Sequence, residues 1–321
     1  MSAEMVAVIP VRGGLLPLGA AETVAEAGGH GLVVGDGAAT AANELAGGVR
    51  IRTLELGDFA PGWWATVLAD LLDGARVVVL PASPDGRDLA PRLAYALGWP
   101  LLAGASRVSV GHVEVGRYHG QLSEQHHPAG PVVATLLPGV RGVEVDPGSR
   151  SVIPLELPEA RRPPTLFEAA GLPQPAAAPD RTTRTDAVIL EVTPPNPASM
   201  DLSEAPKVMA GGAGLGAPER FETLARVAAA LGASPGATRV VADAGWVPAH
   251  RYIGTTGVTV SPKLYIALGI SGAVQHITGI GHPEHVIAVN TDPSAPMMGL
   301  ADLAIVTDAR ALLDELAVRL S

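Results

Sequence analysis

A glycine-rich segment between an apolar run and a helical pattern is the first part of this sequence that could do chemistry. The segment, KVMAGGAGLGAPERF, contains Gly211, Gly212, Gly214 and Gly216. Gly212, Gly214 and Ala217 loosely fit the fingerprint in which glycines let the backbone approach a pyrophosphate at the positive end of a helix. The same glycines also suit a tight turn without any ligand. Only Asp243 could serve as the acidic, ribose-binding residue expected after the next strand.

Ser271 stands where the apolar run LYIALGI passes into a predicted helix. A hydroxyl and free amides at a helix N-terminus form an anion site, and a simple helix cap is the plain alternative. Ser271 could also be the nucleophile of a strand–turn–helix elbow, but that motif needs glycine two positions later, where Ala273 stands. Such a hydrolase needs a histidine and an aspartate as well. His282 or His285 with Asp308 is the only arrangement in the usual chain order.

A long loop over residues 244–260 carries few signals for helix or strand, and long loops inside compact domains tend to be functional. Its pair Thr255 and Thr256, flanked by glycines, offers the hydroxyl and amide donors that a flat heteroaromatic ligand needs. The pair equally fits an ordinary turn. His276 is either a structural histidine or, because it follows the Ser271 turn, one that faces a ligand.

The elements that must position these residues begin with an alternation of strands and helices. Strands are predicted over 6–10, 31–35, 49–54 and 75–80, and helices over 20–29, 38–46, 63–73 and 88–98. This rhythm predicts a largely parallel sheet with helices on both faces. Residues 106–157 show period-two alternation, which predicts an antiparallel extension or hairpin. After a Pro-rich connection over 158–184, the segment AVILEV (187–192) is predicted to close the first sheet.

A second Pro-rich crossing near residue 198 divides the chain into predicted domains of residues 1–198 and 199–321. In the second domain, strands are predicted over 208–212, 238–243, 264–270, 286–290 and 303–308. Helices are predicted over 218–231, from about 272, and over 309–320. The fold class is therefore α/β, with two domains that are each a mainly parallel sheet covered by helices on both faces.

Composition excludes several classes of function. The net charge of -10, without clustered Lys and Arg, argues against a nucleic-acid surface. Because the chain has no cysteine, disulfides, thiolate catalysis and iron–sulfur ligation are excluded, and redox chemistry must reside in an organic cofactor. No apolar run approaches the ~18 to 20 residues that span a bilayer, and no signal peptide is recognisable. A cytoplasmic location is therefore expected.

Three segments taken together resemble the FAD-binding domain of electron transfer flavoprotein alpha subunits. They read VVADAGWVPAHRYIGTTG, SPKLYIALGISGAVQHITGI and AVNTDPSAPMMGLADLAIVTD, and the similarity covers about residues 206–321. The N-terminal region resembles the first alpha-subunit domain in layout, with weaker motifs. The resemblance implies a Rossmann-like, FAD-binding C-terminal domain. It also implies that the N-terminal domain holds no cofactor and contacts a beta subunit.

The resemblance also implies which residues hold FAD. Arg239 matches the arginine over the flavin ring, Thr256 the hydroxyl at the ring's central nitrogen, and His276 the histidine at the pyrimidine-side carbonyl. A positive or donating group at these places favours reduced flavin. The full set is Thr238, Arg239, Ile253, Gly254, Thr255, Thr256, Ser271, Gly272, Ala273, Val274, Gln275, His276, Asn290, Asp308 and Ala309.

Other members of this set correspond to the rest of the dinucleotide. The turn that begins at Ser271 and runs to Gln275 falls at the ribityl-pyrophosphate portion. Thr238 stands where the family has a phosphate-binding serine. Asn290 and Asp308 match positions on the adenosine side.

The sequence departs from the family pattern at the glycine loop and beside the flavin-contacting threonine. Ala213 replaces an arginine that contacts the cofactor, which would remove a charge-assisted bond of about 1.5 to 3 kcal/mol. Lys207 or Arg251 could compensate for this loss. Thr255 and Val258 replace a glutamine and a lysine, so the flavin potential is expected to differ from that of other members.

The implied function is electron transfer and not catalysis in the strict sense. The family implies a heterodimer with a beta subunit that holds AMP, with flavin-dependent dehydrogenases as donors and a membrane quinone oxidoreductase as acceptor. Two alternatives remain: a nicotinamide-nucleotide-binding, transhydrogenase-like domain that uses the glycine loop, and an α/β hydrolase that uses Ser271. Neither alternative accounts for Arg239, Thr256 and His276 together.

Overall fold

The protein is described from a computed structural model that covers residues 3–45, 48–72, 74–117, 122–143, 150–157, 193 and 195–320. The chain divides into two compact units: unit 1 is Met1–Pro138 with Gly142–Val192, and unit 2 is Gly139–Arg141 with Thr193–Ser321. The predicted domain boundary near residue 198 stays a prediction, as does the strand over 187–192, which lies outside the described residues. None of the described helices has the length and apolarity needed to cross a membrane.

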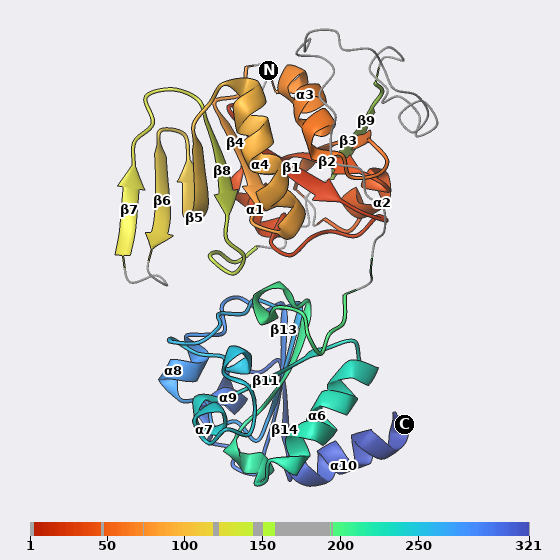
Figure 1. The fold of residues 1–321 in the computed structure, drawn as a ribbon, viewed down its shortest axis with the longest axis vertical. Coiled ribbons are helices and arrows are strands. Elements are labelled where there is room, and N and C mark those ends of the chain that lie inside the picture. Colours follow the sequence, from red (N-terminus) through yellow and green to blue (C-terminus); the bar gives the residue numbers. More distant parts are fainter. Residues whose placement is uncertain are drawn as a thin grey trace, which may run out of the picture. The chain divides into compact units, whose positions relative to one another are not determined.

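Unit 1 is built on a sheet with the strand order β7-β6-β5-β8-β4-β1-β2-β3-β9 (Figure 1). The strands are β1 Met5–Val11, β2 His30–Gly35, β3 Arg50–Glu55, β4 Val77–Pro81, β5 Leu101–Ser109, β6 His112–Arg117, β7 Leu122–His126, β8 Val132–Leu136 and β9 Ser151–Leu155. Along this order, each strand from β5 to β9 pairs in parallel with the next. The pairs β7–β6 and β6–β5 are antiparallel.

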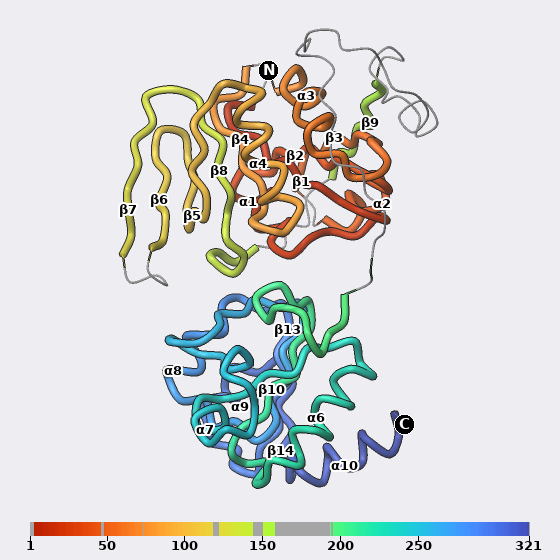
Figure 2. Tube along the Cα trace, in the orientation of Figure 1, coloured from red at the N-terminus to blue at the C-terminus, as the bar shows by residue number. Residues whose placement is uncertain are grey.

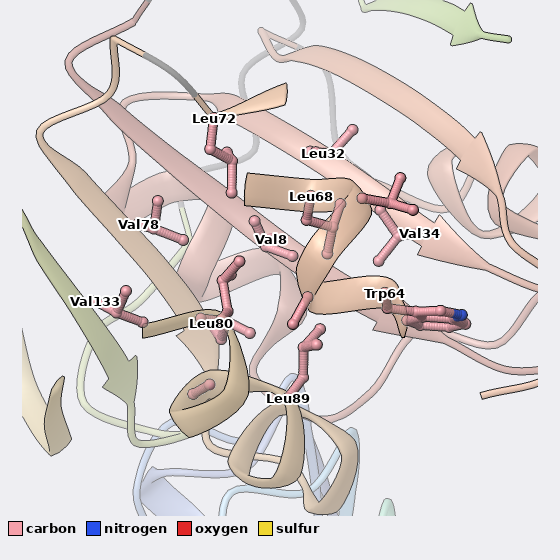
Figure 3. Close-up of a cluster of buried hydrophobic side chains, with 14 of the residues drawn as sticks. Val8, Leu32, Val34, Trp64, Leu68, Leu72, Val78, Leu80, Leu89 and Val133 are labelled. Carbon is pink, nitrogen blue, oxygen red and sulfur yellow. The ribbon is translucent and has the colours of Figure 1, made fainter. Parts of the chain in front are cut away.

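Alternate residues of these strands pack under helices on opposite faces. The helices are α1 Ala20–Glu26, α2 Ala38–Ala42, α3 Pro61–Leu71 and α4 Pro84–Leu97. Val8 and Leu32 join one apolar core with Trp64 of α3 and Leu89 of α4 (Figure 3). On the opposite face, Gly31 lies against Val24 of α1. Helices α3 and α4 run side by side (Figure 2). The predicted helix–sheet–helix layering of this unit is confirmed.

The prediction of an antiparallel extension over residues 106–157 is only partly right. Strands β5, β6 and β7 form it, but β8 inserts between β5 and β4 and pairs in parallel with both. All five residues of β8, from Val132 to Leu136, are buried, which is typical of a central strand covered on both faces. Strand β9 likewise pairs in parallel with β3.

Unit 2 is a parallel sheet with the order β11-β10-β12-β13-β14. Its strands are β10 Lys207–Gly211, β11 Ser234–Ala237, β12 Leu264–Leu268, β13 His285–Asn290 and β14 Leu303–Val306, and its helices are α6 Glu219–Ala230, α7 Arg239–Asp243, α8 Val274–Ile277, α9 Pro296–Gly299 and α10 Ala309–Arg319. Helices α6 and α10 lie on one side of this sheet, and α8 and α9 on the other (Figure 1).

The predicted strand over 238–243 is wrong, because TRVVAD forms the short helix α7. The true strand, β11, is the preceding SPGA, whose small residues carry no apolar signal. Gly236 packs closely against Ile253 there, since a Cβ would lie 2.6 Å from Ile253 Cδ1. Asp243 therefore ends a helix and does not follow a strand. The helix expected from about residue 272 begins at Val274 and is short, spanning Val274–Ile277.

Candidate functional site

The carboxyl ends of β10 and β12 form the centre of the site. Strand β10 has β11 on one side and β12 on the other, and such a point of reversed strand order is where open α/β sheets bind ligands. The loops that follow β10 and β12 touch here. Gly214 N–H donates to the Gly269 carbonyl at 3.2 Å, and a Cβ on Gly214 would lie 2.8 Å from that oxygen. Close packing between two loops therefore requires these glycines.

A run of backbone donors follows β12. Within the part of the chain that the structure describes, the N–H groups of the five residues from Ser271 to Gln275 donate to no protein acceptor. Ser271, Ala273, Val274 and Gln275 are exposed. Successive free amides at a strand-to-helix turn suit the negative charge of a pyrophosphate. The helix-cap alternative for Ser271 is wrong, because the residue that caps α8 is Ala273.

The hydrolase alternative finds no support in this geometry. Among the described residues, no hydrogen bond joins the Ser271 hydroxyl to a histidine. The ring of His276, five residues further on, bonds instead to Tyr265 and Ile253. The elbow therefore lacks an assembled general base.

The loop around Thr255 and Thr256 is tied to the turn that carries the free amides. Thr255 N–H donates to the Gln275 carbonyl at 2.8 Å, and the hydroxyls of Thr255 and Thr278 lie 2.6 Å apart. Thr256 is exposed, with its hydroxyl 3.5 Å from that of Tyr252. The Thr255 hydroxyl thus holds the loop in place, while Thr256 presents its hydroxyl to solvent.

His276 is buried beneath these two segments, with 4% of its surface exposed. Its Nε2 lies 2.8 Å from the Tyr265 hydroxyl, and its Nδ1 lies 2.9 Å from the Ile253 carbonyl oxygen. Burial lowers the pKa of His276, so the neutral ring is favoured. Both ring nitrogens have protein partners, and the predicted contact with a cofactor carbonyl stays a prediction.

Thr238 and Arg239 follow the carboxyl end of β11, on the same side of the sheet as the carboxyl ends of β10 and β12. Thr238 N–H donates to the Gly211 carbonyl at 3.1 Å, which joins the start of α7 to the end of β10. The Arg239 side chain is 60% exposed, and its Nε lies 3.2 Å from an oxygen of Asp243. An exposed ion pair of this kind is weak, so the guanidinium is available to a ligand.

The loops after β13 and β14 complete the edge. Asn290 Nδ2 donates to the Ile270 carbonyl at 3.1 Å and so braces the turn after β12. Asp308 accepts from Arg310 N–H at 2.8 Å, capping α10 just before Ala309, and an oxygen of Asp308 lies 2.6 Å from Arg310 Nη2. Hydrogen bonds from Arg310 hold the pKa of Asp308 well below its usual range, so its carboxylate is charged.

Neither Lys207 nor Arg251 is placed to compensate for Ala213. Lys207 begins β10 at the opposite edge of the sheet, where it donates to the Leu231 carbonyl. Arg251 is buried and donates to the carbonyls of Met200 and Ala198.

The structure places a different cation at the glycine loop. Arg310 Cδ lies 3.9 Å from a Cβ position on Gly216. Arg310 and Arg220 line a hollow of about 400 Å³ beside this loop. Sequence reasoning missed both arginines. Each arginine lies in the first turn of a helix that follows a strand of this sheet, and this position could have indicated a role in binding.

Comparison with known proteins covers most of the sequence. Residues 17–160 match the family described as Electron transfer flavoprotein domain, and residues 201–281 match Electron transfer flavoprotein FAD-binding domain. The electron transfer flavoprotein subunit alpha of Mycobacterium leprae is 32% identical over 273 residues, which are 83% of this chain and 79% of the relative. The chain belongs to the electron transfer flavoprotein alpha subunit family.

Two further relatives show how the similarity is distributed. Protein FixB of Bradyrhizobium diazoefficiens is 35% identical over 267 residues, which are 81% of this chain and 68% of the relative. The mitochondrial alpha subunit of Oryza sativa subsp. indica is 47% identical over 120 residues, 37% of this chain and 34% of the relative.

The donors of this edge fit the cofactor that the family binds. The match to the FAD-binding domain includes the glycine loop, the threonine loop and the turn from Ser271 to Gln275. Free amides and exposed hydroxyls are the groups that a dinucleotide needs along its phosphates and its ring.

Proposed function

We propose that this chain holds FAD along the carboxyl edge of the unit 2 sheet and works as one half of a heterodimer with a beta subunit. The family match supports the cofactor and the role of electron carrier. The observation in this chain that carries the proposal is the run of unpaired amides from Ser271 to Gln275 beside the packed glycine loop. When bound, FAD takes up and releases one or two electrons.

The pyrophosphate is held by the free amides, with Thr238 as a further hydroxyl donor. Arg239 supplies positive charge to the flavin ring, and Thr256 supplies its exposed hydroxyl. Gly254 lets the threonine loop approach the turn closely, because a Cβ at this position would meet the Gln275 carbonyl at 2.8 Å.

The adenosine portion falls at the loops after β13 and β14. Asn290 braces the turn through the Ile270 carbonyl, and Asp308 with Ala309 begins α10. This placement continues the same edge from the phosphate-binding turn, so one extended dinucleotide can follow it.

The family and the exposed position of the site support the partners that we propose. We propose a beta subunit that holds AMP as the permanent partner. Flavin-dependent dehydrogenases serve as electron donors, and a membrane quinone oxidoreductase serves as the acceptor. The predicted cytoplasmic location stays a prediction.

Co-expression with the gene for the beta subunit tests this function. We expect a yellow complex that keeps flavin absorption bands through gel filtration and releases FAD, identified by mass spectrometry, when denatured. A colourless complex that binds a nicotinamide nucleotide would support the transhydrogenase-like alternative. Ester hydrolysis abolished by Ser271→Ala would support the hydrolase instead. Either result would overturn the proposal.

A further inference from the structure

A hollow of about 350 Å³ lies in unit 1, at the amino ends of β1, β2, β3 and β9, and has no role in the function described so far. Helix α3 packs on this face of the sheet and ends at Leu71, and the chain enters β4 at Val77. The sheet face beyond the end of α3 is therefore left open. None of the residues that line the hollow is among those proposed to hold FAD.

The floor of the hollow is apolar. Val6, Leu72 and Ala75 belong to the core of unit 1 and are at most 6% exposed. Leu71 and Ile153 continue the apolar lining toward solvent, and Ile153 is 55% exposed. The aliphatic or aromatic part of a ligand would be removed from water on this floor, which favours binding.

One side of the same hollow is basic. It is lined by His30 of β2 and by Arg50 and Arg52 of β3. The pairing register places His30 beside Arg50 on the neighbouring strand. It places Arg52 beside Ile153 of β9, the edge strand of the sheet (Figure 1). Residues two apart on a strand share a face, so both arginines lie on the face that carries Leu54 of the core.

The three basic side chains have no partner in the chain. Within the described residues, none of them makes a salt bridge or a side-chain hydrogen bond, and no acidic side chain lines the hollow. Other arginines of unit 1, such as Arg12 and Arg117, are paired with carboxylates. Acidic residues outnumber Lys and Arg by 32 to 22 in this chain, so a basic group of three without an acid is unusual. Guanidinium forks bind carboxylate and phosphate groups in a bidentate manner.

We propose that this hollow binds a small amphipathic anion, which consists of a carboxylate or phosphate group joined to an apolar body. Arg50 and Arg52 hold the anionic group, and the core residues of the floor receive the apolar body. The volume of about 350 Å³ lies within the range of about 300 to 1,000 Å³ that small-molecule sites occupy. A neutral apolar compound leaves both guanidinium groups without an acceptor, and a purely hydrophilic anion leaves the floor in contact with water.

Isothermal titration calorimetry on the complex with the beta subunit tests the proposal, with octanoate as the probe. We expect a single octanoate per complex, bound at least about tenfold more tightly than either of two reference compounds. Acetate carries the charge without the apolar body, and octanol carries the apolar body without the charge. Octyl phosphate should also bind, and the tighter of the two anions identifies the preferred group. The flavin absorption spectrum should not change, because the hollow is separate from the cofactor site.

Two substitutions remove the charge at the hollow. Arg52→Gln keeps most of the side chain, and octanoate affinity should fall about tenfold, as for the loss of one charge-assisted bond. Arg50→Gln should also weaken binding and serves as the test if Arg52→Gln does not fold. Arg107→Gln is the matched control, because Arg107 is an exposed arginine on β5 of the same sheet and does not line the hollow. It should leave octanoate affinity unchanged.

Three results would overturn the proposal. Equal affinities for octanoate and octanol would mean that the arginines take no part in binding. Equal effects of Arg52→Gln and Arg107→Gln would mean that octanoate binds elsewhere. If octanoate does not bind to the complex at all, the hollow is closed to small molecules. The FAD content of the complex tests the proposed function separately, because these variants change no residue of the cofactor site.

Discussion

Arg239 extends from the first residue of α7, with most of its side chain in solvent. Removing a fixed positive charge beside the flavin disfavours the added negative charge of the reduced ring. We therefore expect Arg239→Ala to lower the reduction potential of the bound flavin. The free energy of unfolding should change by less than about 1 kcal/mol, because the ion pair with Asp243 is exposed.

Spectroelectrochemical titration of the complex measures this potential. Arg226→Ala is the matched control, because Arg226 is an exposed arginine on α6. It should leave the potential unchanged. If Arg239→Ala also leaves it unchanged, Arg239 does not lie at the flavin ring.

Ala213 is the position where this chain departs most clearly from its family. Ala213 is exposed at the start of the turn Ala213–Leu215, after β10. We expect Ala213→Arg to lower the FAD dissociation constant about tenfold to a hundredfold, which corresponds to one charge-assisted bond of about 1.5 to 3 kcal/mol. Arg310 is the competitor for this role, because its side chain packs against Gly216.

The same substitution in an Arg310→Ala background separates the two cases. Tightening only in that background would mean that Arg310 already supplies the charge in the wild-type protein. No tightening in either background would show that the loop from Gly211 to Gly216 does not face the cofactor.

Residues of the site that belong to a sequence motif were predictable, whereas residues that are placed by a tertiary contact were not. Thr256 and Ser271 lie within the family-like sequence segments and Arg239 directly precedes the first of them, and the structure places all three at the carboxyl ends of the strands of one sheet. The bond between Tyr265 and His276 joins a strand to a helix and has no pattern in the sequence. A tyrosine within an apolar run reads simply as a core residue.

The turn after β12 is the element on which cofactor binding depends most. Ala273 has a φ angle of -56°, which proline also adopts, and its N–H donates to no acceptor within the described residues. Ala273→Pro therefore removes one free amide without backbone strain at that residue. We expect the FAD dissociation constant to rise about tenfold to a hundredfold, as for the loss of one hydrogen bond to a charged group.

Ala273→Gly is the matched variant, because it changes the same residue and keeps the backbone amide. Its FAD affinity, measured by flavin fluorescence, should stay within about threefold of wild type, which allows for the added backbone freedom of glycine. Equal losses in the two variants would mean that the amide of residue 273 does not meet the cofactor.

Elements were predictable where apolar periodicity was strong. Strands β10, β12, β13 and β14 lie where runs such as LYIAL predict them. Strand β11 was missed because SPGA contains a proline and a glycine and owes its place to burial against Ile253. The neighbouring Val240 and Val241 suggested a strand, yet the chain has already reached the end of the sheet and turns into α7.

At the scale of the whole molecule, the α/β class and the helices on both faces of each sheet followed from the alternation of elements. Topology in unit 1 did not follow. The insertion of β8 between β4 and β5 pairs strands separated in sequence by the β6–β7 ribbon. Which strands pair across such a distance depends on which strand can be buried on both faces. A period-two pattern in the sequence does not reveal which strand that is.

The last prediction concerns the partner subunit. Val240 and Val274 are 66% and 71% exposed; Val240 follows Arg239, and Val274 lies within the turn with the free amides. Apolar side chains so exposed beside a ligand are expected to be covered in an obligate complex. We therefore expect the isolated chain to bind FAD weakly and the beta subunit to tighten FAD binding about fivefold to 150-fold.

Thermodynamic linkage makes this prediction testable from both sides. If the beta subunit lowers the FAD dissociation constant by some factor, FAD must strengthen the association of the subunits by the same factor. Calorimetric titrations of FAD into the isolated chain and into the complex give the first value, and titrations of beta subunit into the chain with and without FAD give the second. A monodisperse isolated chain that retains FAD as tightly as the complex would contradict the prediction. In that case the surface around the two exposed valines would not couple FAD binding to the association of the subunits.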